Sequence, residues 1–162
     1  MVEHTSGQIF VSILENNIPA ASAWILGSAA HPNLCGLVQF YDTPMGGTLV
    51  TAEIYGLPNR DTDDGTHFYA MHIHERGNCT PPFDQTGNHY NPNGTTHPQH
   101  AGDLPPLLGN NGSAWMAFYT DRFVPGDVLG RSVVIHAMRD DFTSQPAGDS
   151  GDKIGCGVIL AE

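Results

Sequence analysis

The feature that most constrains this sequence is a long stretch, residues 75–111, with almost no strand or helix pattern. It spans 37 of 162 residues and is rich in Gly, Pro, Asn and His. A loop of this length inside a compact domain is uncommon, and those that occur usually carry function. Something other than secondary structure must therefore hold this stretch, which we call the long loop, and its histidines are the candidates.

Short runs of β-branched and aromatic residues, bounded by turn residues, lie on both sides of the long loop. We expect strands at residues 8–14, 21–26, 36–41, 48–55, 66–74, 113–119, 130–136 and 155–160. No long window has the apolar spacing of an amphipathic helix. The sequence therefore predicts an all-β fold, a Greek-key β-barrel or sandwich of about eight antiparallel strands with one long loop.

The charge of the chain excludes two classes of partner. It has 17 acidic residues against 6 Lys and Arg, a formal net charge of −11. Such a chain does not bind nucleic acid through a broad basic face, and it is not attracted to anionic membranes. No apolar run approaches the roughly 18 residues of a membrane span. We expect one domain over residues 1–162.

The N-terminal residues lack the pattern of a signal peptide. The protein is therefore expected either in the cytosol or, with a leader removed, in the periplasm or outside the cell.

Nine histidines make this residue more frequent than Lys and Arg together. His72 and His74 are two apart on an expected strand, so both rings project from the same face. Taken alone, such a pair is as often exposed as metal-binding. His136 ends an apolar run and, taken alone, is more typical of a buried core histidine than of a ligand.

The long loop itself contains a second set of metal-binding residue types. His89, His97, His100 and Asp103 are spaced by 8, 3 and 3 residues. Three imidazoles and one carboxylate are a sound tetrahedral zinc set. A solvated polar loop would explain neither this density of histidine nor the lack of Lys and Glu. The long loop is therefore predicted to be a metal-binding loop.

Taken together, these residues resemble the copper/zinc superoxide dismutase family over nearly the whole chain. The matching segments, in the family's order, are His72-Ile-His74-Glu-Arg-Gly-Asn-Cys79, Gly87-Asn-His89-Tyr-Asn-Pro92, His97, His100-Ala-Gly-Asp103-Leu-Pro105, Gly130-Arg-Ser-Val-Val-Ile-His136, Asp140-Asp141 and Gly155-Cys156-Gly-Val-Ile159. The short gap from His74 to Cys79 is closer to the bacterial branch of the family than to the animal branch.

The resemblance implies copper and zinc as cofactors. The implied copper ligands are His72, His74, His89 and His136, and the implied zinc ligands are His89, His97, His100 and Asp103. His89 would then be shared between the two ions. Four nitrogens in a flattened arrangement suit Cu(II), whereas three nitrogens and one oxygen suit zinc. Asp140 would join one copper histidine to one zinc histidine by hydrogen bonds. His4, His31 and His67 match no ligand position and are expected not to bind metal.

The resemblance also assigns roles outside the ligand set. Cys79 and Cys156 match the intrasubunit disulfide of the family, and Cys35 is left as a free thiol. Lys153, the single lysine of the chain, occupies the position of an arginine that lies at the mouth of the family's substrate channel. Lysine keeps the charge but not the planar fork of arginine. We therefore expect Lys153 to guide an anion less well than arginine would.

The implied activity is dismutation of superoxide by alternate reduction and reoxidation of copper, with His89 as a proton-carrying catalytic residue and Lys153 as a guide. Superoxide is the implied small-molecule substrate, and neither nucleic acid nor membrane is expected as a partner. A monomer and a homodimer both stay open.

The sequence leaves three alternatives to the enzyme. The first is a zinc-binding, copper-poor and inactive relative, which the presence of all four copper ligands disfavours. The second is a copper delivery domain, for whose usual thiol-rich module 162 residues leave no space. The third is a β-sandwich interaction module with a histidine-rich loop. The copper and zinc content of the protein, with its copper-dependent activity, would separate these.

Overall fold

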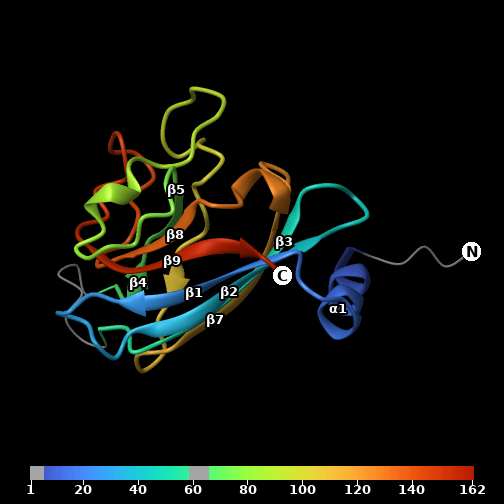
Figure 1. The fold of residues 1–162 in the computed structure, drawn as a ribbon, viewed down its shortest axis with the longest axis horizontal. Helices are drawn as coiled ribbons and strands as arrows, with labels where there is room; N and C mark the ends of the chain where they lie inside the picture. The colour runs from blue at the N-terminus through green and yellow to red at the C-terminus, as the bar shows by residue number, and fades with distance from the viewer. Residues whose placement is uncertain (1–5, 59–65) are drawn as a thin grey trace, which may run out of the picture.

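The computed structural model describes residues 6–58 and 66–162, to which all structural statements below refer (Figure 1). The prediction about His4 lies outside these residues. The described chain is mostly strand and loop, with one α-helix, α1 (Ser6–Asn16), and the 3-10 segments η1 (Asp84–Thr86) and η2 (Pro125–Val128). None of its helices is long and apolar enough to cross a membrane.

Seven strands form one curled antiparallel sheet in the order β5-β8-β9-β1-β2-β3-β7. Their bounds are β1 (Ala21–Gly27), β2 (Cys35–Asp42), β3 (Thr48–Tyr55), β5 (Met71–His74), β7 (Ala114–Thr120), β8 (Ser132–His136) and β9 (Lys153–Ala161). A second, small sheet pairs β4 (Phe68–Tyr69) with β6 (Leu107–Leu108). Because the last strand, β9, returns to lie beside β1, the order β9-β1-β2-β3 is of the Greek-key type. The predicted all-β fold is confirmed, whereas the single domain over residues 1–162 stays a prediction.

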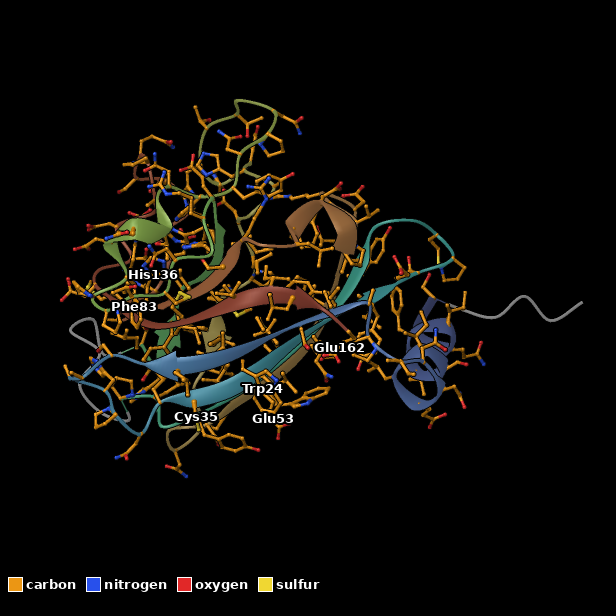
Figure 2. All side chains as sticks on the ribbon, viewed as in Figure 1. Trp24, Cys35, Glu53, Phe83, His136 and Glu162 are labelled. Atoms are coloured by element: carbon orange, nitrogen blue, oxygen red, sulfur yellow. A yellow bond between two sulfur atoms is a disulfide. The ribbon has the colours of Figure 1, made fainter. Side chains whose placement is uncertain are left out.

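The core lies inside the curled sheet and follows the alternation of the strands. Val38 and Phe40 of β2 and Val50 of β3 are fully buried in one apolar cluster. Within each strand, the residues between the core positions point outward, as Trp24 of β1 and Glu53 of β3 do (Figure 2). This is the period of two that a half-buried strand requires.

Strands β5 and β8 differ from the others because they are buried on both faces. Met71 and Ile73 of β5 belong to the core, so His72 and His74 project from the opposite face. In an open sheet that face would be wet, but here loops cover it. Figure 1 shows the loops gathered at this end of the barrel.

Two predictions about secondary structure need correction. Residues 8–14 were expected as a strand but lie in α1. Their β-branched residues are typical of strands, yet the apolar side chains of Ile9, Phe10 and Ile13 recur at the helical spacing. This stripe packs on Tyr41 and Leu49 of the sheet. Tertiary packing of an amphipathic face thus decides in favour of the helix.

The expected strand at residues 66–74 is divided into β4 and β5, which belong to different sheets. Ala70 lies between them, where its N–H donates to the carbonyl oxygen of Met138 at 2.8 Å and its own carbonyl accepts from His136 N–H at 2.9 Å. The chain therefore changes sheets at Ala70 without losing its backbone hydrogen bonds.

The long loop is attached to the exposed edge of β5 by backbone hydrogen bonds. Ile73 donates to the Gly102 carbonyl oxygen at 2.8 Å and accepts from Tyr90 N–H at 2.8 Å, while Gly102 N–H donates to Tyr90 O at 2.9 Å. A Cβ atom on Gly102 would overlap the Ile73 carbonyl oxygen, so this close approach requires glycine. The edge strand is thereby covered by two segments of the loop.

Candidate metal centre

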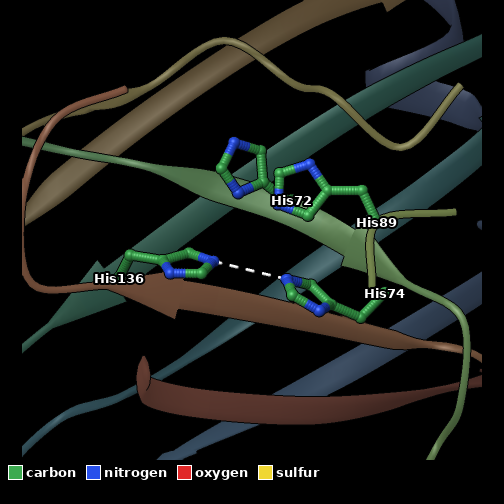
Figure 3. A group of neighbouring side chains, drawn as sticks. All are labelled: His72, His74, His89 and His136. Carbon is green, nitrogen blue, oxygen red and sulfur yellow. Dashed lines mark hydrogen bonds between the residues drawn. The ribbon is translucent and has the colours of Figure 1, made fainter. Parts of the chain in front are cut away.

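Four histidines converge on the loop-covered face of β5 and β8. We call His72, His74, His89 and His136 the strand group, since three of them come from strands and His89 comes from the long loop (Figure 3). One nitrogen from each ring lies within 4.8 Å of the others. The Nε2 atoms of His74 and His136 are 3.3 Å apart. All four side chains are buried.

In His72, His74 and His136, the other ring nitrogen lies beside an oxygen that can only accept a hydrogen bond. His72 Nε2 lies 2.8 Å from Asp140 Oδ2, and His74 Nδ1 lies 2.8 Å from the Gly87 carbonyl oxygen. His136 Nδ1 faces the Gly151 carbonyl oxygen at 3.4 Å. Each of these nitrogens therefore carries the ring proton. The lone pairs left over are those of His72 Nδ1 and of Nε2 in His74 and His136.

A second group lies entirely in the long loop. This loop group is His89, His97, His100 and Asp103, whose donor atoms also lie within 4.8 Å of one another. Three Nδ1 atoms surround the Asp103 carboxylate, at 2.7 Å for His89, 3.1 Å for His97 and 3.3 Å for His100. His89 therefore faces the loop group with Nδ1 and leaves Nε2 for the strand group.

Electrostatics keep the ligands in the forms that bind metal. Burial lowers the pKa of His72 to about 4 despite its hydrogen bond with Asp140, and burial holds the pKa values of His74 and His136 well below the usual range. These imidazoles are neutral near pH 7. Burial acts to raise the pKa of Asp103, but its hydrogen bond with His89 and the nearby histidine charges lower it to about 2. Asp103 is therefore an anion.

Asp140 joins the two groups, as the resemblance implied. Its Oδ2 lies 2.8 Å from His72 Nε2 and its Oδ1 lies 2.7 Å from His97 Nε2. Burial opposes ionisation, yet these hydrogen bonds and one from Phe142 N–H lower the pKa of the carboxyl. Gly148, at φ 74°, passes so close that a Cβ atom there would overlap Asp140 Oδ1. A single carboxylate thus orients one ring of each group.

Among the described residues, three buried ring nitrogens make no hydrogen bond: His72 Nδ1, His89 Nε2 and His97 Nδ1, the last of which lies near the Asp103 carboxylate but not in hydrogen-bonding geometry. Buried polar atoms without partners are rare in native proteins. Each of the three points into one of the two groups, where a bound ion would satisfy it. Four imidazole nitrogens suit Cu(II), and three imidazoles with a carboxylate suit zinc, so the residues fit both ions.

A cavity of about 850 Å³ opens beside both groups. Its lining includes His74, His89 and His136 together with Lys153. Lys153 is the cross-strand partner of His136, next to an irregularity in the β8–β9 ladder. Such irregularities re-aim side chains and are frequent beside active sites. The predicted guide residue therefore lies in the same cavity as the strand group.

Three hydrogen bonds hold the Lys153 ammonium. Its Nζ donates to Thr86 Oγ1 at 2.8 Å, to the Gly87 carbonyl oxygen at 3.3 Å and to the Phe83 carbonyl oxygen at 3.4 Å. Burial lowers the pKa of Lys153, and Arg76 adds to this effect while Asp84 opposes it. Thr86, which the sequence did not indicate as functional, is fully buried beneath the ammonium.

The predicted disulfide between Cys79 and Cys156 is present, and Cys35 is a free, exposed thiol. The disulfide ties the long loop to β9 across a separation of 77 residues. Chain-entropy arguments give at most about 4 to 5 kcal/mol for a loop of this size. The cysteines pack with Val134 and with Phe83, whose carbonyl oxygen accepts a hydrogen bond from Lys153.

His31 and His67 belong to neither of the two groups, and that they bind no metal stays a prediction. Gln145 and Arg122 contact the backbone of the loop group but were not predicted. Their contacts are made to main-chain atoms, whose positions no spacing in the sequence indicates.

Comparison with known proteins places most of the chain in one family. The family model described as copper/zinc superoxide dismutase (SODC) matches residues 34–159. Superoxide dismutase [Cu-Zn] of Deinococcus radiodurans is 38% identical over an alignment of 149 residues, and the match covers 78% of this chain and 77% of that protein. Superoxide dismutase [Cu-Zn] of Legionella pneumophila is 33% identical over an alignment of 146 residues, and the match covers 85% of each chain.

The structural comparison agrees. A solved structure of a double mutant of a SOD-like protein from Bacillus subtilis matches with a TM-score of 0.72 and covers 86% of this chain and 97% of that chain. At 24% identity, this match supports the fold alone. Fold, metal groups, disulfide and sequence relatives therefore lead to one conclusion: the chain belongs to the copper/zinc superoxide dismutase family.

Proposed function

We propose that this protein dismutates superoxide, releasing dioxygen from one superoxide and hydrogen peroxide from a second. The observation that carries the proposal is the shared ring of His89, which presents Nδ1 to the loop group and leaves a buried, unpartnered Nε2 for the strand group. A solitary structural zinc site would not need the second group. Two adjacent sites with a common imidazole suit a redox ion placed beside a redox-silent one.

In this proposal the strand group holds copper and the loop group holds zinc. Copper held there would supply a one-electron couple for the two half-reactions, since four imidazole nitrogens accommodate both of its oxidation states. The loop group, with its ionised Asp103, suits zinc. Asp140 fixes the tautomers of His72 and His97, so their Nδ1 lone pairs face the ions.

His89 is the proposed proton carrier. Its Nε2 is buried, has no other hydrogen-bond partner and faces the strand group beside the cavity. An imidazole nitrogen in this position can hold a proton when it is not ligated and release it to a nascent peroxide. The Nδ1 side stays anchored by the loop group, so the ring keeps its position while Nε2 changes partner.

Lys153 is the proposed guide for the substrate. The chain has a net charge of −11, so an anionic substrate must be attracted by local positive charge. Bound divalent ions are the largest such charges, and Lys153 adds an ammonium in the same cavity. Its three hydrogen bonds to protein acceptors use the three donors of an ammonium. It would therefore act mainly through its charge rather than by binding superoxide directly.

The test combines metal analysis with an activity assay on the whole protein. About one copper and one zinc per chain, with dismutation that disappears on copper removal and returns on copper loading, is the expected result. Zinc alone, with no activity after copper loading, would instead establish the copper-poor, inactive relative. Whether a second copy joins the protein as a homodimer stays a prediction, which sedimentation of the same sample would measure.

A further inference from the structure

The three loop ligands other than His89 lie outside every described strand and helix. His97 lies in a turn, His100 in a bend and Asp103 in an isolated bridge to His72, yet all three are buried. A buried backbone that lacks a ladder must find hydrogen-bond partners elsewhere. Two side chains from distant parts of the chain supply partners here, and neither side chain is a ligand.

The first side chain is Gln145, from the loop between β8 and β9. Its Oε1 accepts from His97 N–H at 3.0 Å, and its Nε2 donates to the His97 carbonyl oxygen at 2.7 Å. Both backbone groups of one ligand are thus bound by one amide. The ring of the same residue is bound separately, because Asp140 holds its Nε2.

The second side chain is Arg122, just beyond the end of β7. Its Nη1 is directed at three carbonyl oxygens of the long loop: those of Pro98 at 2.9 Å, His100 at 3.1 Å and Asp103 at 3.4 Å. Two of these carbonyls belong to ligands of the loop group. A guanidinium suits such a cluster because its donors are fixed in a plane and stay charged.

We propose that Gln145 and Arg122 are positioning residues that hold the main chain of the loop group in the conformation that binds zinc. Between them they contact the backbone of His97, His100 and Asp103. A loop that is already ordered loses less conformational entropy when the ion binds, so affinity rises. The two residues lie in different loops, Gln145 between β8 and β9 and Arg122 after β7.

The inference rests on the zinc assignment in the proposed function, and zinc affinity is its readout. The full chain is stripped of metal, and Zn²⁺ binding is measured against a chromophoric chelator. Gln145→Ala and Arg122→Met are each expected to weaken zinc binding by about 10-fold, the lower end of the range for residues that orient ligands. The double variant should lose about 100-fold. The absorption spectrum of bound Co²⁺ should change in each variant, because it reports the geometry of the site.

A matched control separates positioning from general destabilisation. Thr48 Oγ1 donates to the Phe123 carbonyl oxygen at 2.8 Å, so it holds the residue next to Arg122 without contacting the long loop. Thr48→Val should lower the thermal stability of the metal-free chain but leave zinc affinity and the Co²⁺ spectrum unchanged. Arg122→Lys, which keeps the charge, should recover part of the affinity lost in Arg122→Met.

The outcomes are distinct. Unchanged zinc affinity in Gln145→Ala and Arg122→Met, or a loss no larger than in Thr48→Val, would overturn the inference while leaving the proposed function intact. If Arg122→Met does not fold, Arg122→Lys must still bind zinc more weakly than the wild-type chain, and equal affinity would overturn the role of Arg122. A wild-type chain that binds no zinc would overturn both proposals at once.

Discussion

The strand group and the loop group share one histidine but are built in different ways. In the strand group, His72, His74 and His136 lie on β5 and β8, whose backbones are paired in the ladder of the main sheet. In the loop group, every ligand comes from the long loop, and its conformation depends on side-chain contacts from elsewhere. The strand group is therefore held by a continuous ladder, and the loop group by two isolated bridges to β5 together with side-chain hydrogen bonds.

This difference predicts that the two sites respond differently to loss of a ligand. A sheet keeps its geometry without a metal because its hydrogen bonds and core contacts remain. The long loop has isolated bridges and turn hydrogen bonds instead of a continuous ladder, so we expect bound metal and the contacting side chains to contribute much of its order. Asp140 contacts a ring of each group and therefore links the strand group to the loop group.

The largest expected effect comes from removing one ligand of each group. His136→Ala should lose copper and reduce dismutation by more than about 100-fold, beyond the 10- to 100-fold typical of residues that only orient a ligand. It should still bind zinc. Asp103→Ala should lose zinc and speed amide hydrogen exchange across residues 75–111, while amides of β5 and β8 stay protected. If amides of the long loop exchanged as fast in His136→Ala as in Asp103→Ala, the proposed difference between the two groups would be wrong.

An intermediate effect is expected at the residue that links the groups. Asp140→Asn replaces a carboxylate that accepts from both His72 and His97, so affinity for both metals should fall by about 10- to 100-fold. Asp141→Asn is the control, because that neighbouring carboxylate accepts from Thr143 and Ser144 rather than from a histidine ring. Metal titrations of both variants provide the measurement. Weakening at only one metal group would show that Asp140 does not couple them.

The smallest expected effect concerns the cavity shared by both groups. Lys153→Arg should raise kcat/KM roughly two- to threefold at low ionic strength, because a guanidinium has five donors and keeps some of them for the substrate. The gain should shrink as salt screens the charge. Lys153→Met should lower the rate under the same conditions. Pulse radiolysis over a range of ionic strength measures both, and an unchanged or lower rate in Lys153→Arg would contradict the proposed difference.

Much of the candidate site could be predicted because its ligands have characteristic types and spacings. His72 and His74 are two apart on a strand, and the loop ligands follow at short intervals. Residue type and spacing can therefore both be read from the sequence. Helix α1 was missed because its β-branched residues are typical of strands, and the packing of its apolar stripe on Tyr41 and Leu49 decides in favour of the helix. Gln145, Arg122 and Thr86 were missed because they act on backbone atoms or on Lys153 across large sequence separations.

The sequence by itself determined which side chains can bind metal and that short strands surround a long loop, while the pairing of Cys79 with Cys156 came from the resemblance to the family. These properties depend on residue type and local period. Tertiary structure alone decided which nitrogen of each ring keeps its proton, that Lys153 lies opposite His136, and that Gln145 and Arg122 contact the ligand backbone. The reason is physical, because hydrogen bonds depend on distance and direction in space, and folding brings together residues that the sequence keeps far apart.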